Sequence, residues 1–259
     1  MTTSRTIMLA ALLLIAVPLA ASEIPPDQRR SGYSFMTPET RAIQDDDTAN
    51  PGMLSVLDGE ALWKKKMGAA DKACADCHDD ASTSMKGTAA RYPAFEPSLS
   101  RPVTLEQRIN LCRANHQQAT PLPYESHDLL ALTAFVARQS LGMPIAAGDD
   151  PQLKPFIDRG HDLFLHREGQ LNLACANCHD DNFDKHLAGS AITQGQPTGY
   201  PLYRLEWQSL GSLERRLRGC IFGVRAQPYD YGAPELVELE LYLMVRAKGM
   251  PMETPAVRP

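Results

Sequence analysis

The sequence lacks three features that would each point to a large class of protein: an excess of positive charge, clear strand patterning, and a membrane-spanning run in its body. The formal net charge at pH 7 is −5, so the chain has no electrostatic case for binding nucleic acid, whose phosphates attract clustered lysine and arginine. Runs of β-branched residues are short and no Asn-Gly turn occurs, which favours a mostly helical chain.

The one pronounced apolar run, Ile7–Val17, lies at the N-terminus. Arg5 precedes it, and the small residues Ala21 and Ser22 follow it. A charged start, a short apolar core and small residues at its end are typical of a secretory signal peptide. The alternative is a membrane anchor, but the run is too short to span a bilayer comfortably. We therefore expect a signal peptide over residues 1–21 and export of the mature chain to the periplasm.

Composition divides the mature chain into three parts. Residues 22–52 contain Pro25-Pro26 and three successive aspartates, with little apolar periodicity. This predicts an N-terminal arm that docks on the rest of the chain, or more simply a partly ordered leader. Residues 53–148 and 149–259 form two halves, each large enough to bury a core, and they join near Ala146–Pro151.

The two halves repeat one series of motifs. Each half has a glycine fifteen residues before a Cys-x-x-Cys-His box, a Tyr-Pro pair after the box, and then a Leu-Glu-x-Arg-x-x-x-Cys segment. The matching positions are Gly59 and Gly160, Cys74–His78 and Cys175–His179, Tyr92 and Tyr200, and Leu105–Cys112 and Leu213–Cys220. The second half holds seven extra residues around 184–198. Self-similarity of this kind indicates an internal duplication.

Each half also ends in a predicted helix. Apolar residues recur at helical spacing over 126–141 and over 234–248. Ser126 is the predicted N-cap of the first helix, and Pro234 suits the first turn of the second. A Gly-Met-Pro sequence follows each helix, where glycine can cap the last turn and proline prevents the helix from continuing.

The two boxes carry the strongest chemical signal. In a Cys-x-x-Cys-His box the two thiols attach a c-type haem covalently, and the histidine becomes the proximal ligand of its iron. The alternatives are a redox disulfide pair or a zinc site, but neither requires a histidine after both pairs. We therefore expect two covalently bound c-type haems, in a mostly α fold of two tandem cytochrome c-like domains. The predicted attachment residues are Cys74, Cys77, Cys175 and Cys178, and the proximal ligands are His78 and His179.

The sixth ligand of each iron has several candidates. Met143 and Met250 occupy matching positions, and methionine is a common ligand. Cys112 and Cys220 also match, and their simplest alternative in an exported protein is a disulfide between them. Equivalent positions in separate modules are normally far apart, whereas a disulfide needs Cα atoms within ~7 Å. We therefore favour thiolate ligation by Cys112 and Cys220, which would lower the potential of the iron and argues against a simple electron carrier.

The halves differ in the charge around the later cysteine. Residues 204–225 have a balance of +3, whereas residues 96–117 have a balance of +1. Arginines beside a cysteine lower the pKa of its thiol and can hold a small dianion. Pairing with haem propionates or exposure to solvent is the alternative. For Arg216 the spacing leaves both open, because Arg108 occupies the matching place.

The chain resembles the SoxA family, the dihaem cytochrome subunits of L-cysteine S-thiosulfotransferases, from about Gly59 through Val257. The most specific segments are Arg216–Cys220 and Ala226–Glu235. The resemblance implies that Cys220 is both the distal ligand of the second haem and the active-site cysteine, carried as a persulfide. It also implies that Arg216 binds thiosulfate. In the first half it implies that the axial pair consists of His78 and Cys112.

The implied reaction couples thiosulfate to a cysteine of the SoxYZ carrier, and the electrons pass through haem to an acceptor cytochrome c. The implied tight partner is SoxX, a separate c-type cytochrome that would form a heterodimer with this chain. Two alternatives stay open. One is a non-catalytic dihaem electron carrier, and the other is a thiosulfate dehydrogenase that forms tetrathionate.

Overall fold

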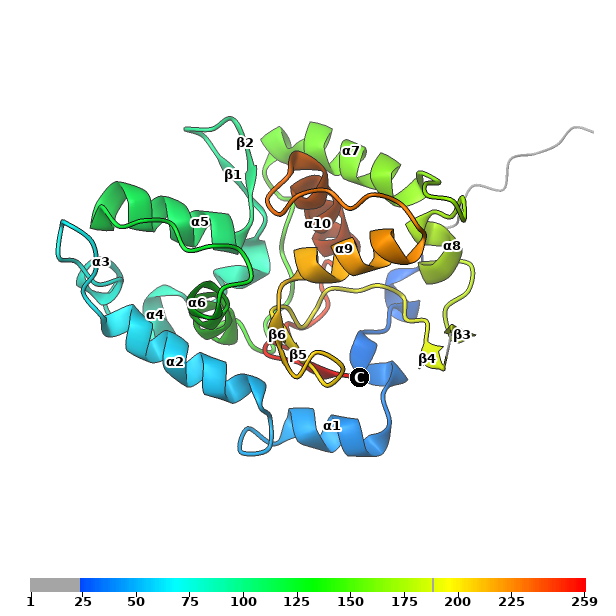
Figure 1. The fold of residues 1–259 in the computed structure, drawn as a ribbon, viewed down its shortest axis with the longest axis horizontal. Helices are drawn as coiled ribbons and strands as arrows, with labels where there is room; N and C mark the ends of the chain where they lie inside the picture. Colours follow the sequence, from blue (N-terminus) through cyan, green and yellow to red (C-terminus); the bar gives the residue numbers. More distant parts are fainter. Residues whose placement is uncertain (1–23, 188) are drawn as a thin grey trace, which may run out of the picture.

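Figure 1 shows the computed structural model of the chain, which describes residues 24–187 and 189–259. The expected signal peptide lies outside the described residues. After an arm that contains α1 (Pro38–Asp45), the first half consists of α2 (Gly52–Lys64), α3 (Ala75–His78), α4 (Ala81–Ser84), α5 (Leu105–Cys112) and α6 (His127–Arg138). The second half consists of α7 (Lys154–Leu165), α8 (Cys175–His179), α9 (Leu213–Gly223) and α10 (Pro234–Arg246). Within the described residues no helix has the length and apolar character needed to cross a membrane.

The strands are short, as the sequence predicts. Two antiparallel hairpins occupy equivalent places, one formed by β1 (Ala94–Glu96) with β2 (Arg101–Val103) and the other by β5 (Leu202–Arg204) with β6 (Ser209–Gly211). The C-terminal strand β7 (Val257–Arg258) pairs in parallel with β5. The extra residues of the second half form the small hairpin of β3 (His186–Leu187) and β4 (Ser190–Ala191).

Each half is built on two helices that cross at a glycine. Helix α2 packs on α6, and α7 packs on α10. A Cβ added to Gly59 would collide with the carbonyl oxygen of Ala131, and one added to Gly160 would collide with that of Glu238. The glycine before each box is therefore required because the backbones of two helices meet there.

The predicted terminal helices are confirmed, and their ends differ from expectation. Ser126 caps α6 by accepting a hydrogen bond from the backbone of Leu129, and Pro234 is the first residue of α10. Both helices end before the Gly-Met-Pro segments. Those two segments instead bond to each other, since the backbone N–H of Gly142 donates to Met252 (2.8 Å) and that of Ile145 donates to Met250 (2.9 Å). We call this pairing of 142–145 with 249–252 the central ladder.

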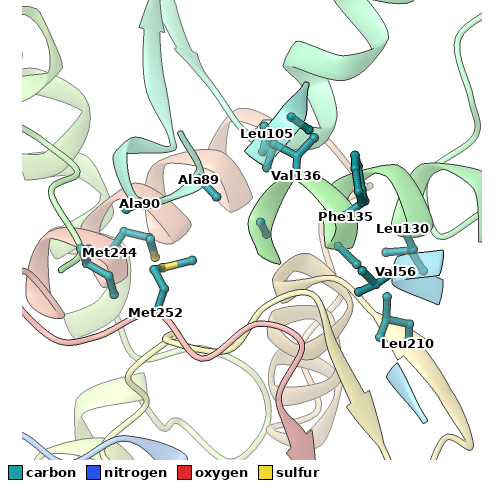
Figure 2. Packing of buried hydrophobic residues seen from close by; sticks show 14 of the residues in the cluster. Val56, Ala89, Ala90, Leu105, Leu130, Phe135, Val136, Leu210, Met244 and Met252 are labelled. Atoms are coloured by element: carbon teal, nitrogen blue, oxygen red, sulfur yellow. The ribbon is translucent and has the colours of Figure 1, made fainter. Parts of the chain in front are cut away.

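The larger hydrophobic core draws on both halves. Figure 2 shows residues of α2, α5 and α6 packed in the same cluster as Met244 and Met252 from the second half. A second cluster lies within the second half around Phe164, Leu236 and Tyr242. Because Met244 and Met252 are buried among residues of the first half, the two halves share a core as well as the central ladder.

The arm docks on the second half of the chain. The buried side chain of Asn50 donates to the carbonyl of Pro255 (2.9 Å) and accepts from the backbone of Gly52 (2.9 Å). Further along, the hydroxyl of Ser31 donates to Glu253 (2.6 Å). Figure 1 shows α1 beside the C-terminal strand, which agrees with its contacts to β7.

Candidate functional site

Each half brings its box and its later cysteine together. In the first half, Cys74 and Cys77 lie within electrostatic reach of Cys112, the last residue of α5. The sulfurs of the first half therefore converge on one place although α3 and α5 are far apart in sequence. All six cysteines lie in the described part of the chain and are free, so the alternative of a disulfide between Cys112 and its counterpart on α9 is wrong.

The second half shows the same convergence with closer interactions. Cys175 and Cys178 on α8 both interact electrostatically with Cys220 on α9, and His179 forms a hydrogen bond with the Cys220 side chain. Burial, followed by the nearby Cys220, raises the pKa of the Cys175 thiol to about 12. The imidazole and the cysteine sulfur thus face each other beside both attachment cysteines.

The extra segment of the second half, around residues 184–198, fixes the orientation of the His179 ring. Its Nδ1 lies 2.7 Å from the carbonyl oxygen of Thr193. A carbonyl only accepts, so Nδ1 carries a proton, and Nε2 is the ring nitrogen that remains to interact with Cys220 or with a metal. Gly195 closes over the ring, because an added Cβ there would lie 3.0 Å from Cγ of His179.

The two later cysteines have different electrostatic surroundings. Burial alone would raise the pKa of Cys220, but the hydrogen bond from His179 and the charges of Arg216 and Arg204 lower it to about 7. For Cys112, burial raises the pKa above the ordinary value of a thiol despite the nearby Arg108. The surroundings of Cys220 thus stabilise a thiolate, and those of Cys112 do not.

The arginines of the second half separate into two kinds. Arg216 lies one turn before Cys220 on α9 and interacts with that sulfur, with Tyr200 and with Glu206. The other two arginines of this helix are stacked on aromatic rings. The stacked pairs are Arg215 on Trp207, 4.2 Å from the ring centroid, and Arg218 on Tyr231, 4.4 Å from it.

The matching arginine of the first half has a different partner. Arg108 forms an ion pair with Glu96 at the end of β1 and a hydrogen bond with Tyr92. The positive charge of Arg108 is therefore balanced by the carboxylate of Glu96. The sequence left open whether Arg216 merely repeats the role of Arg108. The surroundings of Arg216 differ, because within the described residues it forms no ion pair with a carboxylate, although Glu206 acts on it electrostatically.

The residues present fit a c-type haem in each half. The second half offers two thiols that would attach the haem, and an imidazole and a partly buried sulfur that would ligate its iron, which is the donor set of six-coordinate haem iron. In the first half, His78 ends α3 with its ring 5.7 Å from that of Trp63. Within the described residues no group of three or more His, Cys, Asp and Glu side chains is arranged to hold a metal ion by itself, as a zinc site would require.

Two contributions to the site were not predicted from the sequence. The carbonyl of Thr193 belongs to the backbone and has no residue signature, although the extra segment after the second box marks the region. Arg204 was counted only as one of several arginines. Comparison of the repeats could have identified it, because it stands where the first half has Glu96.

Comparison with known proteins agrees with this geometry. The sequence model described as SoxA/TsdA, cytochrome c domain, matches residues 58–145 and again residues 159–252. This tandem match and the helical structure confirm the predicted fold class. The L-cysteine S-thiosulfotransferase subunit SoxA of Pseudaminobacter salicylatoxidans is 41% identical over 235 residues, which cover 90% of this chain and 82% of the relative.

A second relative and a solved structure extend the likeness. The subunit of the same name from Rhodovulum sulfidophilum is 39% identical, over 90% of this chain and 81% of that protein. The crystal structure of SoxXA from P. pantotrophus contains a chain that superposes with a TM-score of 0.86 at 30% identity, covering 89% of this chain and 87% of that one.

Proposed function

The chain belongs to the SoxA/TsdA cytochrome c family, and on that premise we propose that it is a SoxA-type subunit of an L-cysteine S-thiosulfotransferase. Relatives that match most of its length carry that activity in their names. The reaction converts thiosulfate and a carrier cysteine thiol into a cysteine S-thiosulfonate. One S–S bond forms, one proton is released, and two electrons leave.

The residues of the second half have separate roles in this reaction. Arg216 neutralises and positions the dianion beside Cys220, whose persulfide would place the reacting sulfur one bond further out. Thr193 holds Nδ1 of His179, so that Nε2 would be the nitrogen that ligates the iron. The haem, when bound, would accept the electrons.

The proposal includes two covalently bound c-type haems. The first would be attached through Cys74 and Cys77, and the second through Cys175 and Cys178. We propose His78 with Cys112, and His179 with Cys220, as the axial pairs.

Partners and location follow from the family and the N-terminus. The similar solved chain belongs to SoxXA of P. pantotrophus, and on that likeness we propose a SoxX-type cytochrome as the partner of this chain. A SoxYZ-type carrier would supply the cysteine, and a cytochrome c would accept the electrons. The N-terminal pattern over 1–21 supports export, and we propose the periplasm as the compartment.

One observation carries the proposal: of two equivalent cysteines, Cys220 has its pKa lowered by a hydrogen-bonded imidazole and two arginines, whereas burial raises the pKa of Cys112. Peptide mass spectrometry of the haem-loaded protein tests it directly, with Cys112 as an internal control. We expect an additional sulfur on Cys220 after exposure to thiosulfate and none on Cys112. Plain thiols at both positions would instead favour a non-catalytic electron carrier.

Product analysis separates the remaining alternative, since the family also includes the TsdA type. A thiosulfotransferase forms a protein-bound thiosulfonate only when the carrier is present. A thiosulfate dehydrogenase forms free tetrathionate without any carrier. Accumulation of tetrathionate in the absence of carrier would contradict the proposed activity.

A further inference from the structure

The two hairpins that follow the Tyr-Pro pairs differ at one equivalent position. Glu96 is the last residue of β1 and pairs with Arg101 across its hairpin. Arg204 is the last residue of β5 and pairs with Ser209 across the other hairpin. In each half an arginine lies one helical turn before the later cysteine, namely Arg108 in the first half and Arg216 in the second. Glu96 and Arg204 each lie twelve residues before that arginine. The duplication thus holds a carboxylate in one copy and a guanidinium in the other.

In the first half, the carboxylate of Glu96 neutralises the arginine beside Cys112, so that no positive charge is left there for an anion. The Glu96 side chain is only 10% exposed and forms its ion pair with Arg108. The backbone N–H of Ser98 also donates to it at 3.1 Å. Hydrogen bonds from Ser98 and the charge of Arg108 lower the pKa of Glu96, so this carboxylate stays ionised. The positive charge near Cys112 is thereby cancelled within the protein.

In the second half, the same position adds a positive charge. Burial and then repulsion from Arg216 lower the pKa of Arg204, which places the two guanidinium groups near each other, and both interact with Cys220. The Nε of Arg204 is buried and has no hydrogen-bond partner in the part of the chain that the structure describes. Two like charges in a partly buried place are unfavourable unless an anion joins them.

The nearest carboxylate, that of Glu206, does not neutralise Arg204 as firmly as Glu96 neutralises Arg108. Glu206 lies 3.1 Å from Nη2 of Arg204, but its side chain is 66% exposed. An ion pair in contact with solvent is weak and is easily exchanged for another anion. Glu206 also acts electrostatically on Arg216, but within the described residues it forms no ion pair with that guanidinium. The Arg216 guanidinium and the buried Nε of Arg204 can therefore both bind a ligand.

We propose that Arg204 acts together with Arg216 to bind the sulfonate end of thiosulfate, and that the replacement of Glu96 by Arg204 across the repeat restricts anion binding to the second half. Two guanidinium groups provide the forked donors that match sulfonate oxygens, which leaves the outer sulfur of thiosulfate free to face Cys220. Arg204 is thus a specificity-determining residue. This inference rests on the proposed function, since it assigns the substrate contacts of the same site.

The experiment measures binding of radiolabelled thiosulfate by equilibrium dialysis to the haem-loaded chain in complex with its cytochrome partner, with no carrier present. Arg204→Glu recreates the ion pair of the first half and should therefore fold. It should bind thiosulfate at least on the order of a hundredfold more weakly than wild type. Arg204→Gln removes only the charge and should weaken binding on the order of tenfold, whereas Arg204→Lys should retain part of the affinity.

Glu96→Gln is the matched control, because it changes the equivalent position of the half that binds no anion. It should bind thiosulfate as wild type does. Resonance Raman spectra of the same variants report on the haem propionates, the other anions that two arginines could hold. Propionate bands that shift in Arg204→Glu without any loss of thiosulfate affinity would overturn the assignment.

Failure of this inference is distinguishable from failure of the proposed function. Wild-type affinity in Arg204→Glu, with carrier-dependent coupling of thiosulfate intact, would overturn the role of Arg204 and leave the thiosulfotransferase in place. A wild-type complex that neither binds thiosulfate nor couples it to the carrier would remove both. Weaker binding in Arg204→Glu and unchanged binding in Glu96→Gln would support the inference.

Discussion

The carbonyl oxygen of Thr193 accepts a hydrogen bond from Nδ1 of His179 at 2.7 Å and so determines which nitrogen of that histidine is free. The bond comes from the extra segment that the first half lacks. Within the described residues no equivalent acceptor bonds to His78 in the first half. The histidines of the two boxes thus differ in their hydrogen bonds, although the boxes share one sequence pattern.

A substitution that displaces the His179 ring should change the ligand field of the proposed second haem. Gly195 has φ +71°, a region that favours glycine, and an added Cβ would press on the His179 ring. Gly195→Ala should destabilise the chain by about 1–3 kcal/mol and shift the electron paramagnetic resonance signal of the second haem. Gly189→Ala is the control, since it has φ +87° and an added Cβ meets nothing within 4 Å. A signal that is equally perturbed in both variants would argue against the steric cause.

The helix crossings predict large losses of stability. Gly160→Ala should lower the free energy of unfolding by about 3 kcal/mol or more, because its Cβ would collide with the backbone of α10 at Glu238. Asp162→Ala, an exposed change on the same helix, should have an effect below about 0.5 kcal/mol. Denaturant unfolding of both variants checks this. Equal midpoints would show that α7 and α10 can move apart at no cost.

The docking of the arm depends on a buried amide. Asn50→Ala removes the bond to Pro255 and the bond to Gly52, and should cost about 1–3 kcal/mol. Hydrogen exchange should then become faster across α1, because the variant loosens the arm from the second half. Thr48→Ala, an exposed position nearby, should leave exchange unchanged. Protection of α1 at the wild-type level in Asn50→Ala would mean that other contacts hold the arm.

Stability should also depend on pH through Glu214, which is buried at the start of α9. Burial raises its pKa to about 7, and the nearby Glu106 and Glu125 add to this rise, while the backbone N–H of Gly232 and the charge of Arg218 oppose it. The pKa of an unfolded glutamate is about 4.3, so the folded chain binds a proton that the unfolded chain has released. This contribution to stability is complete below about pH 4 and is lost as pH rises through about 7.

Glu214→Gln should therefore flatten the fall in the free energy of unfolding between pH 5 and pH 8, by on the order of 2–3 kcal/mol. Urea unfolding at several pH values measures this slope. Glu60→Gln, on the exposed side of α2, is the control and should leave the slope unchanged. An unchanged slope in Glu214→Gln would assign the pH dependence to other groups.

The sequence predicted those parts of the molecule that repeat or that follow local rules. The repeated boxes and the caps at Ser126 and Pro234 each depend on a few neighbouring residues, whereas the repeat of Gly59 and Gly160 was noted without its cause, the helix crossing. The central ladder was not predicted, because its bonds join backbone groups about a hundred residues apart. Thr193 contributes only a backbone carbonyl. Alignment of the repeats could have identified Arg204, but the groups that it approaches, Arg216 and Cys220, are known only from the folded chain.

The shared core of the two halves has a consequence for electron movement. Met244 and Met252 are buried among first-half residues, and the central ladder fixes the ends of α6 and α10 to each other. Neither half can rotate against the other without exposing this core to water. Any exchange of electrons between the two proposed haems therefore takes place across a constant separation. Its rate should not depend on solvent viscosity, as it would if the halves had to move to meet.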